Sequence, residues 1–400
     1  MKRQLVASVF VALLGWTPTQ AAEAPVKIGL LEDMSGIFAD ISGKGSAQAA
    51  RMAIEDFGGT VLGRPIELLV ADHQNKPDIA SATAAEWIKD KRIDMITGVA
   101  HSAASLAVRE LTRGAGVVDI MSSGGSTDLT NKACSPTGFH WSWDSYMLVK
   151  STGEAVVKDG GKSWFFLSTD SAFGVASQRE ATAVIDQNGG TVKGSVKVRH
   201  GLPDMTSFLL QAQNSGSQVV GLAIAGSDFI NSVRQASEFG ITASGQSLAA
   251  LVAFITDVHS IGLQNAQGMY ISEPFYWDLT DETRAFSERF SKAVGAMPTT
   301  IQAGIYSAVF HYLKSVKAAG STEAKAVAAK IRELPVNDFW TVDARVREDG
   351  RVLRPVHLFR VKTPAESKRP WDYYRLVSTL DGAAAARPLA DSTCGFIKQD

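Results

Sequence analysis

The fold is decided by the stretch RIDMITGVAHSAASLAVRELTRGAGVVDIMSS (92–123). Within it, residues 92–100 and 116–123 are short apolar runs bounded by glycine, and we expect each to form a β-strand. Residues 102–115 lie between them and place apolar side chains at helical spacing. A strand, a helix and a second strand in this order are typical of a βαβ unit in a parallel sheet.

The same alternation continues toward both ends of the chain. Upstream, we expect strands at 26–31 and 65–72 and helices at 45–57 and 78–90. Downstream the pattern restarts, with helices expected at 146–160, 173–190, 205–214 and 227–239 and strands at 162–169, 191–198, 217–224 and 268–274. Further helices are expected at 281–294, 300–318 and 322–334, and a hairpin around Asp349-Gly350 within 343–362. The later helices have no strands of their own, so we expect them to cover the first unit.

The expected fold class is α/β, with two Rossmann-like lobes that each contain a parallel sheet. Four hundred residues are too many for one ordinary hydrophobic core, which also indicates two domains. We assign 25–144 plus 276–342 to the N-terminal lobe and 145–275 plus 343–400 to the C-terminal lobe and tail. A chain divided in this way crosses between the lobes several times and places a ligand in the cleft between them.

Charge and composition exclude several classes of protein. Forty Lys and Arg residues stand against 41 Asp and Glu residues, and this balance argues against a nucleic-acid partner. No apolar run reaches the roughly 18 residues of a membrane-spanning helix. With 45% hydrophobic and 20% charged residues, the chain has the composition of a globular protein and not of a disordered one.

The first 24 residues have the layout of a secretory signal peptide. Lys2 and Arg3 are followed by an apolar core at 5–16 and by small residues within 19–24. The alternative is a buried N-terminal helix. A cleaved signal peptide over 1–24 would place the mature protein in the periplasm, with no membrane anchor.

The chain contains two cysteines, Cys134 and Cys394. An even number in an oxidising compartment favours a disulfide, and two free buried thiols are the alternative. A bridge would attach the C-terminal tail to the body of the protein and could contribute several kcal/mol to stability.

Motifs of enzymes are absent from the sequence. Residues 41–48 have the wrong spacing for a dinucleotide fingerprint, and 161–163 imitate a phosphate loop but have Val156 where glycine is required. Neither a G-x-S-x-G elbow nor an H-E-x-x-H motif occurs, and the seven histidines are scattered singly. We therefore expect a binding protein with no cofactor and no metal, and not an enzyme.

Three loops of the first unit carry small polar residues at the carboxyl ends of expected strands. They contain Ser35, then Ser102, then Ser123 and Gly125. In a parallel sheet these loops line the crevice where ligands bind. Hydroxyl groups and free N–H groups at helix N-termini favour an anion such as a carboxylate. Ordinary helix capping, for which Ser102 and Ser126 are well suited, is the alternative: it is the better explanation of any one loop, and the two explanations are equal for the three loops together.

The second unit would face these loops with Phe173, Ala225 and the consecutive aromatics Phe275, Tyr276 and Trp277. Successive residues of a strand face opposite sides, so three neighbouring rings cannot all enter one core. We expect at least one of them at a surface or in the cleft, although one ring in the core and one in a seam between the lobes is an equal alternative.

Several motifs together resemble one family. The segments VKIGLLEDMSG (26–36), PDIASATAAEWI (77–88), TGVAHSAASLAV (97–108) and TDSAFG (169–174) are similar to those of extracytoplasmic solute-binding proteins of ABC importers. The resemblance is to the leucine/isoleucine/valine-binding branch and covers essentially the whole mature chain. It implies a type I periplasmic-binding fold with two lobes, three crossings and hinge closure around a small ligand. It also implies delivery to an ABC permease, and we expect a monomer.

The resemblance assigns roles to individual residues. The family's carboxylate-binding serine falls on Ser102, and its next carboxylate-binding loop falls on Ser123 and Gly125, where glycine replaces a hydroxyl-bearing residue. Two cleft tyrosines of the family fall on Phe173 and near Ala225.

The acidic residue that pairs with the ammonium of an amino acid falls near Leu251. No acid occurs in QSLAALVAF (246–254), and a buried ammonium without a partner would cost several kcal/mol. We therefore expect a small organic acid without an α-amino group. Phe173, Leu251 and residues 275–277 favour an aromatic body. A branched-chain amino acid, an amide, or a ligand-sensing receptor of the same fold are the alternatives.

Overall fold

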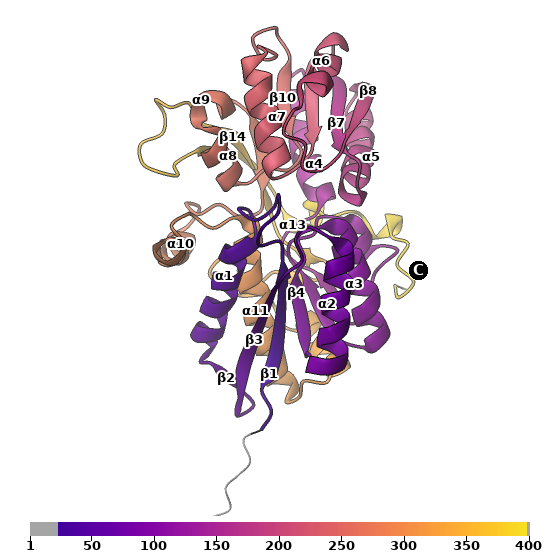
Figure 1. Ribbon diagram of the computed structural model, residues 1–400, viewed down its shortest axis with the longest axis vertical. Coiled ribbons are helices and arrows are strands. Elements are labelled where there is room, and N and C mark those ends of the chain that lie inside the picture. The colour runs from indigo at the N-terminus through magenta and orange to yellow at the C-terminus, as the bar shows by residue number, and fades with distance from the viewer. Residues whose placement is uncertain (1–22, 398–400) are drawn as a thin grey trace, which may run out of the picture.

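The computed structural model describes residues 23–397 as two lobes stacked along the long axis of the molecule (Figure 1). The predicted signal peptide lies outside the described residues except for its last two positions. Within 23–397, no helix combines the length and the hydrophobicity that crossing a membrane requires.

The first lobe contains a six-stranded sheet in the order β2-β3-β1-β4-β5-β6, parallel except for the β2–β3 pair. Its strands are β1 (Val26–Glu32), β2 (Thr60–Val61), β3 (Arg64–Asp72), β4 (Met95–Gly98), β5 (Val118–Met121) and β6 (Gly138–His140). The preceding and intervening helices are α1 (Gly43–Phe57), α2 (Pro77–Glu86), the π-helical turn η1 (Trp87–Lys91), α3 (Ser102–Ala115) and the 3-10 turn η2 (Thr127–Thr130). β1 is buried almost throughout, as expected for a parallel strand covered on both faces.

Three helices from later in the sequence return to this lobe, as predicted. They are α10 (Asp281–Val294), α11 (Thr300–Ala319) and α12 (Ala324–Glu333). Their apolar side chains share one core with β1 and α1, and α11 packs directly on α1. The first lobe is therefore assembled from two distant parts of the chain.

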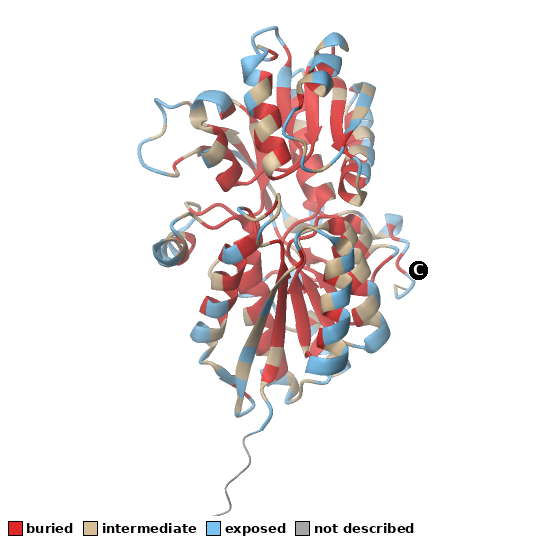
Figure 2. Cartoon of the chain, viewed as in Figure 1, coloured by how far each residue is buried: buried red, intermediate tan, exposed pale blue. Residues whose placement is uncertain are grey.

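The second lobe contains a seven-stranded sheet in the order β15-β14-β11-β10-β9-β7-β8. Its strands are β7 (Ser163–Thr169), β8 (Thr191–Val198), β9 (Val219–Ala223), β10 (Ser247–Ala250), β11 (Tyr270–Glu273), β14 (Val356–Val361) and β15 (Tyr374–Leu380). Its helices are α4 (Ser145–Lys158), α5 (Ala172–Gln187), α6 (Thr206–Asn214), α7 (Ser227–Glu238), α8 (Ile255–Ile261) and α9 (Leu263–Ala266). Strands β7 to β11 are parallel, whereas β14 and β15 are antiparallel additions. Each lobe encloses a buried interior (Figure 2), and the predicted α/β class is confirmed.

Three segments connect the sheets of the two lobes within the described residues. They are residues 141–144 after β6, residues 274–280 after β11, and residues 354–355 before β14. Arg351 lies at this hinge, with Nε 2.6 Å from Asp144 and Nη1 donating to the backbone oxygens of His140 and Trp141. The buried ion pair thus holds the first crossing against the hairpin that precedes the third.

The predicted hairpin around Asp349-Gly350 is present as β12 (Arg345–Val346) and β13 (Val352–Leu353). It packs with the first lobe, because Val346 and Val352 belong to that lobe's core. The prediction had placed residues from 343 onward in the second lobe. We propose instead that this boundary lies between β13 and β14.

The C-terminal tail also returns to the first lobe. It contains α13 (Gly382–Ala385) and the 3-10 turn η3 (Leu389–Asp391), and its end lies beside α3 in Figure 1. Cys394 forms a disulfide with Cys134, with an S–S distance of 2.08 Å, so the predicted bridge is confirmed. The tail therefore covalently joins the end of the chain to the lobe in which the chain begins.

A candidate ligand pocket between the lobes

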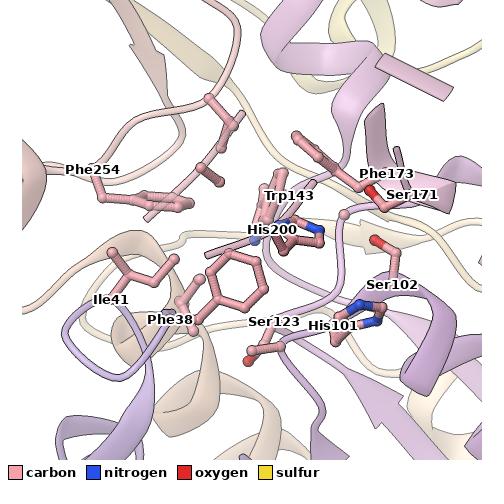
Figure 3. Close-up of a pocket in the computed structure, with 15 residues that line it drawn as sticks. Phe38, Ile41, His101, Ser102, Ser123, Trp143, Ser171, Phe173, His200 and Phe254 are labelled. Carbon is pink, nitrogen blue, oxygen red and sulfur yellow. The ribbon is translucent and has the colours of Figure 1, made fainter. Parts of the chain in front are cut away.

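A pocket lies between the two lobes (Figure 3) and contains about 410 Å³ of space not occupied by protein atoms, part of it open to solvent. Its walls are formed by Phe38, Ile41, Ala100, His101, Ser102, Ser123, Gly125, Trp143, Ser171, Phe173, His200, Ala225, Val252, Phe254 and Ile301. Both lobes and the first crossing contribute, so the shape of the pocket depends on how the lobes are placed relative to each other.

A strained loop after β4 forms the first polar part of the wall. Val99 has a φ of 65°, which is unfavourable for a β-branched residue. Two hydrogen bonds hold it in place: its N–H donates to the oxygen of Leu31 at 2.7 Å, and its oxygen accepts from Ser105 at 2.6 Å. This conformation directs the chain into α3, and it places His101 and Ser102 at the pocket.

His101 caps the N-terminus of α3 with its ring. Its Nδ1 accepts hydrogen bonds from the backbone N–H groups of Ala103 and Ala104, at 3.1 and 3.3 Å. Nδ1 therefore carries no proton in the neutral ring, and Nε2 is the donor. Burial, together with His200 and His73, lowers the pKa of His101 to about 4. At neutral pH the residue is an uncharged donor.

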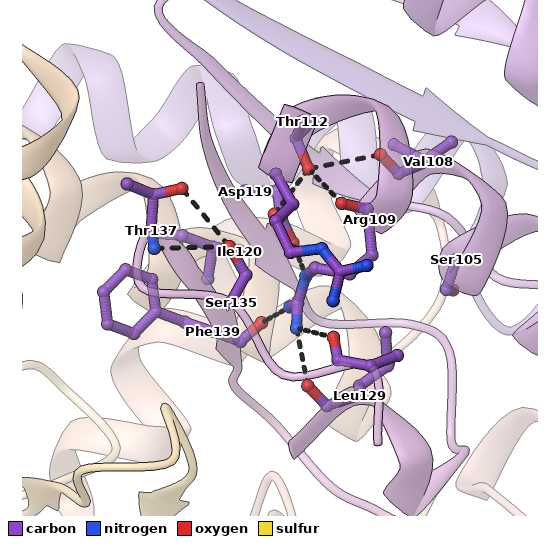
Figure 4. Close-up of polar contacts among 12 residues, drawn as sticks. Ser105, Val108, Arg109, Thr112, Asp119, Ile120, Leu129, Ser135, Thr137 and Phe139 are labelled. Carbon is purple, nitrogen blue, oxygen red and sulfur yellow. Dashed lines mark hydrogen bonds and ion pairs between the residues drawn. The ribbon is translucent and has the colours of Figure 1, made fainter. Parts of the chain in front are cut away.

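A buried polar network anchors α3 from its other face (Figure 4). Arg109 lies 2.6 Å from Asp119 on β5 and donates to the backbone oxygens of Leu129 and Phe139, at 2.5 and 3.0 Å. Thr112 also donates to Asp119, at 2.7 Å. Removing one member would leave a buried charge uncompensated, so the network fixes the position of α3 against β5.

Ser123 forms the second polar part of the wall, in the loop after β5. Its Oγ lies 2.5 Å from Oε1 of Glu32, the last residue of β1. Glu32 is fully buried, and this burial raises its pKa to about 8 against the opposing effect of the hydrogen bond with Ser123. The carboxyl group behind Ser123 is therefore mainly neutral at pH 7.

The second lobe adds two polar groups. Ser171 caps α5 by accepting a hydrogen bond from the N–H of Gly174 at 3.2 Å. His200 follows β8, with Nδ1 3.3 Å from the carboxylate of Asp228, and its ring centre lies 5.8 Å from that of His101 in the opposite lobe. The N-termini of α3 and α5 thus meet at the same end of the pocket, where their dipoles favour an anion.

Aromatic and aliphatic side chains form the other end. In Figure 3, Phe254 and Ile41 lie across the pocket from Ser102 and Ser171. The ring of Trp143, from the first crossing, is centred 5.6 Å from that of Phe254. The pocket therefore separates a polar end from an apolar one.

Gly125 provides space for this arrangement. A Cβ atom at position 125 would lie 2.3 Å from the ring of Trp143. The indole nitrogen of Trp143 is buried and has no hydrogen-bond partner among the described residues. Glycine at position 125 thus leaves the space that the indole ring of Trp143 occupies.

Five of the residues predicted from sequence line the pocket together: Ser102, Ser123, Gly125, Phe173 and Ala225. Their role in ligand binding stays a prediction. The structure brings them from four different loops to one place, as expected for the carboxyl ends of strands in facing sheets.

Ser35 and Leu251 do not line it. Ser35 is exposed and donates to Asp72 at 2.6 Å. Leu251 packs into the core of the second lobe with Trp164, whereas the next residue, Val252, faces the pocket. The two neighbouring side chains therefore face different sides of the segment that follows β10.

Phe275, Tyr276 and Trp277 are also outside the pocket, and each is buried in the core. They follow β11, which ends at Glu273, and lie in the second crossing. Because the segment is not a strand, its successive side chains need not face opposite sides, and all three rings can enter the core. The three rings pack on the side of the hinge formed by residues 340, 359, 371 and 374.

Sequence reasoning missed most of the apolar end. The pocket residues not predicted as sites are Phe38, Ile41, Ala100, His101, Trp143, Ser171, His200, Val252, Phe254 and Ile301. His101 and Ser171 adjoin predicted residues or lie in the same loops, and Trp143 lies at the expected first crossing. Phe38, Ile41 and Ile301 carry no local signal, because only the packing of one lobe on the other brings them to the pocket.

Within residues 23–397, none of the side chains that line the pocket is Asp, Glu, Lys or Arg. An ammonium group would find no carboxylate in the wall. A carboxylate would meet hydroxyl groups and the neutral imidazole of His101, which can donate hydrogen bonds to it.

Two lobes, three crossings and an interlobe pocket define a two-lobe ligand-binding protein. Residues 25–368 match the family described as periplasmic binding protein, and the chain belongs to this family of ABC transporter proteins. The comparison with curated proteins gives no match.

Solved structures agree. A periplasmic binding protein from Burkholderia mallei is 43% identical, with a TM-score of 0.92 over 94% of this chain and 99% of that one. A branched chain amino acid ABC transporter periplasmic ligand-binding protein from Burkholderia xenovorans is 36% identical, with a TM-score of 0.82 over 93% and 99% of the chains. A solute-binding protein of Rhodopseudomonas palustris in complex with benzoate is 18% identical, with a TM-score of 0.83 over 93% and 99%, and shows a likeness of fold.

Proposed function

We propose that this protein is the periplasmic substrate-binding component of an ABC importer and binds a small aromatic carboxylate that lacks an α-amino group. It would be exported by the signal peptide at 1–24, act as a monomer without catalysis, and deliver its ligand to the permease. The observation that carries the proposal is the division of one pocket into a polar end without charged side chains and an aromatic end.

The polar end supports the carboxylate. Ser102, Ser123 and the Nε2 of His101 are neutral donors, and two helix N-termini add favourable dipoles. Hydrogen bonds to a charged group contribute about 1.5–3 kcal/mol each, so no arginine or lysine is required.

The apolar end supports an aromatic body. The rings of Trp143, Phe173 and Phe254 pack edge to face, with centres 5.6 and 6.3 Å apart. A ring from a ligand would extend this arrangement, and such aromatic pairs contribute about 0.5–1.5 kcal/mol beyond the area they bury. The benzoate complex of the R. palustris protein is consistent with an aromatic acid in this fold.

A branched-chain amino acid is the second candidate, because the relative from B. xenovorans carries that description. Its ammonium would be buried beside a wall without any carboxylate, at a cost of several kcal/mol. Thermal-shift measurements followed by calorimetry would separate the two, with benzoate, 4-hydroxybenzoate, cinnamate, leucine and phenylalanine as ligands. We expect stabilisation by at least one aromatic acid and none by the amino acids. Stabilisation by leucine alone would overturn the proposal.

A Ser102→Ala variant tests whether the ligand binds in this pocket. It removes one donor from the polar end, and we expect it to weaken the binding of an aromatic acid about tenfold or more. Binding that is unaffected by this change would place the ligand outside the pocket.

A further inference from the structure

Glu32 lies behind the polar end of the pocket without lining it. It is the last residue of β1, it is fully buried, and its Oε1 lies 2.5 Å from Oγ of Ser123. A Cβ atom at Gly98 would lie 3.0 Å from its carboxyl group, so the end of β4 packs closely against it. Ser123 therefore stands between a buried carboxyl group and the space open to a ligand.

The hydroxyl of Ser123 has a single hydrogen to donate. If Glu32 is ionised, this hydrogen points to Glu32, and Ser123 presents only lone pairs to the pocket. If Glu32 is protonated on Oε1, this O–H donates to Ser123, and the hydrogen of Ser123 is free to point into the pocket. Only the second arrangement offers a donor to a carboxylate.

We propose that Glu32 is a positioning residue that must be protonated when an acid ligand binds, so that binding takes up a proton wherever the free protein holds Glu32 ionised. The inference rests on the proposed function, because it requires a ligand with a carboxylate. Two buried carboxylates on either side of one hydroxyl would repel each other, which disfavours the doubly ionised state. Burial already raises the pKa of Glu32 to about 8, which places the transition in an accessible range.

Other titratable groups lie on the elements packed around Glu32. Asp33 follows it in the chain and accepts the N–H groups of Gly36 and Phe38. Asp72 is the last residue of the neighbouring strand β3, and His73 follows it. Burial lowers the pKa of His73. For Asp72, burial alone would raise the pKa, but the hydrogen bonds from Ser35 and Met34 outweigh it, and the pKa is lowered. Neither therefore changes charge in alkaline solution.

His101, from the same lobe, and His200, from the opposite lobe, also line the pocket. The lowered pKa of His101, about 4, keeps it neutral throughout. His200 is paired with Asp228 and is the remaining group that could couple to an anion, so it needs its own variant.

The test is calorimetry with benzoate, or with 4-hydroxybenzoate if that binds more tightly, in buffers of different ionisation enthalpy. At pH 8.5 we expect uptake of about three-quarters of a proton for each ligand bound, and close to none at pH 6.5. The Kd should rise about fivefold between pH 8 and pH 9. Glu32→Gln, whose amide can donate to Ser123 at every pH, should bind with a constant Kd and without proton uptake. His200→Asn should retain the uptake at pH 8.5.

Binding by the unmodified protein at pH 8.5 without proton uptake would overturn the inference and leave the proposed function intact. Loss of the uptake in His200→Asn, or its persistence in Glu32→Gln, would also overturn it by assigning the proton elsewhere. If no aromatic acid binds at any pH between 5 and 9, the proposed function fails, and the inference fails with it.

Discussion

Two groups of aromatic side chains lie close to the junction of the lobes. The pocket aromatics are Trp143, Phe173 and Phe254, and the core aromatics are residues 275–277. All are at least nine-tenths buried, and Trp143 lies in the first crossing as residues 275–277 lie in the second. Burial and aromatic content therefore do not distinguish a binding wall from a structural seam.

The two groups differ in what their polar atoms contact. In the core group, Nε1 of Trp277 and the hydroxyl of Tyr276 both donate to the backbone oxygen of Trp371, at 2.9 and 3.3 Å. In the pocket group, Nε1 of Trp143 has no partner among the described residues. Buried donors are normally satisfied, and Nε1 of Trp143, at the wall of the pocket, is available to a ligand, whereas the donors of the core group are used within the protein.

The largest expected effect is on the stability of the core group. Trp277→Ala should lower the free energy of unfolding by about 3–5 kcal/mol, because a buried indole and its hydrogen bond are both lost. Denaturant unfolding would measure this change, with Trp277→Phe as a milder control. The affinity of the folded variant for benzoate should remain within twofold of that of the unmodified protein. A large loss of affinity would remove the distinction between the two groups.

The corresponding change in the pocket group acts on affinity. Trp143→Ala removes a ring that lies next to two other rings at the apolar end, and we expect an aromatic acid to bind about 100-fold more weakly. Calorimetry at a temperature well below the unfolding transition would measure the Kd. Phe275→Leu is the matched control in the other group and should leave the Kd unchanged. Equal effects of the two variants would contradict the comparison.

An intermediate effect is expected at Gly125, the position where the resemblance to the family implies a hydroxyl-bearing residue. Any side chain there must displace the ring of Trp143, since Cβ would approach it to 2.3 Å. Overpacking of this kind costs about 1–3 kcal/mol, so Gly125→Ala should weaken the binding of benzoate about tenfold. Gly125→Ser should be no better, although it adds a donor. Tighter binding by Gly125→Ser would show that Trp143 moves aside without loss.

Most of the fold could be predicted from the sequence, because long periodic segments such as those of β4, α3 and β5 have strong local patterns. The strand β10 was missed. Its sequence, Ser-Leu-Ala-Ala at 247–250, has no β-branched or aromatic residue and resembles neither a strand nor a helix. This omission also concealed Val252 and Phe254, which follow the strand into the pocket.

The residues of the site likewise fall into those that local sequence patterns predict and those that only the structure reveals. Ser102, Ser123 and Gly125 were predictable, because they follow strands of one parallel sheet and the rule for carboxyl ends places them together. Phe38 and Ile301 are far apart in the sequence and reach the pocket through the packing of one lobe on the other. A local pattern contains no information about that orientation, so these positions required the structure.

The smallest expected effect is at Ser35, which the sequence placed in the cleft beside Ser102. The two serines resemble each other in sequence context, because each lies in a loop after a strand of the same sheet. In the structure the hydroxyl of Ser35 is exposed and donates to Asp72, whereas Ser102 is buried at the pocket wall. Ser35→Ala should therefore change the Kd for benzoate less than twofold and the stability by about 0.5 kcal/mol or less.

Calorimetry of Ser35→Ala beside Ser102→Ala makes the comparison direct, since both variants lose one hydroxyl group from a loop of the first lobe. A loss of affinity in Ser102→Ala alone would show that a hydroxyl group contacts the ligand because it lies at the wall of the pocket. Being a serine in a loop after a strand would not be sufficient. A loss of equal size in Ser35→Ala would mean that the loop at 33–36 turns inward when ligand binds. The polar end of the pocket would then contain one more hydroxyl group than it does in the present structure, because Ser35 would donate its hydrogen bond to the ligand instead of to Asp72.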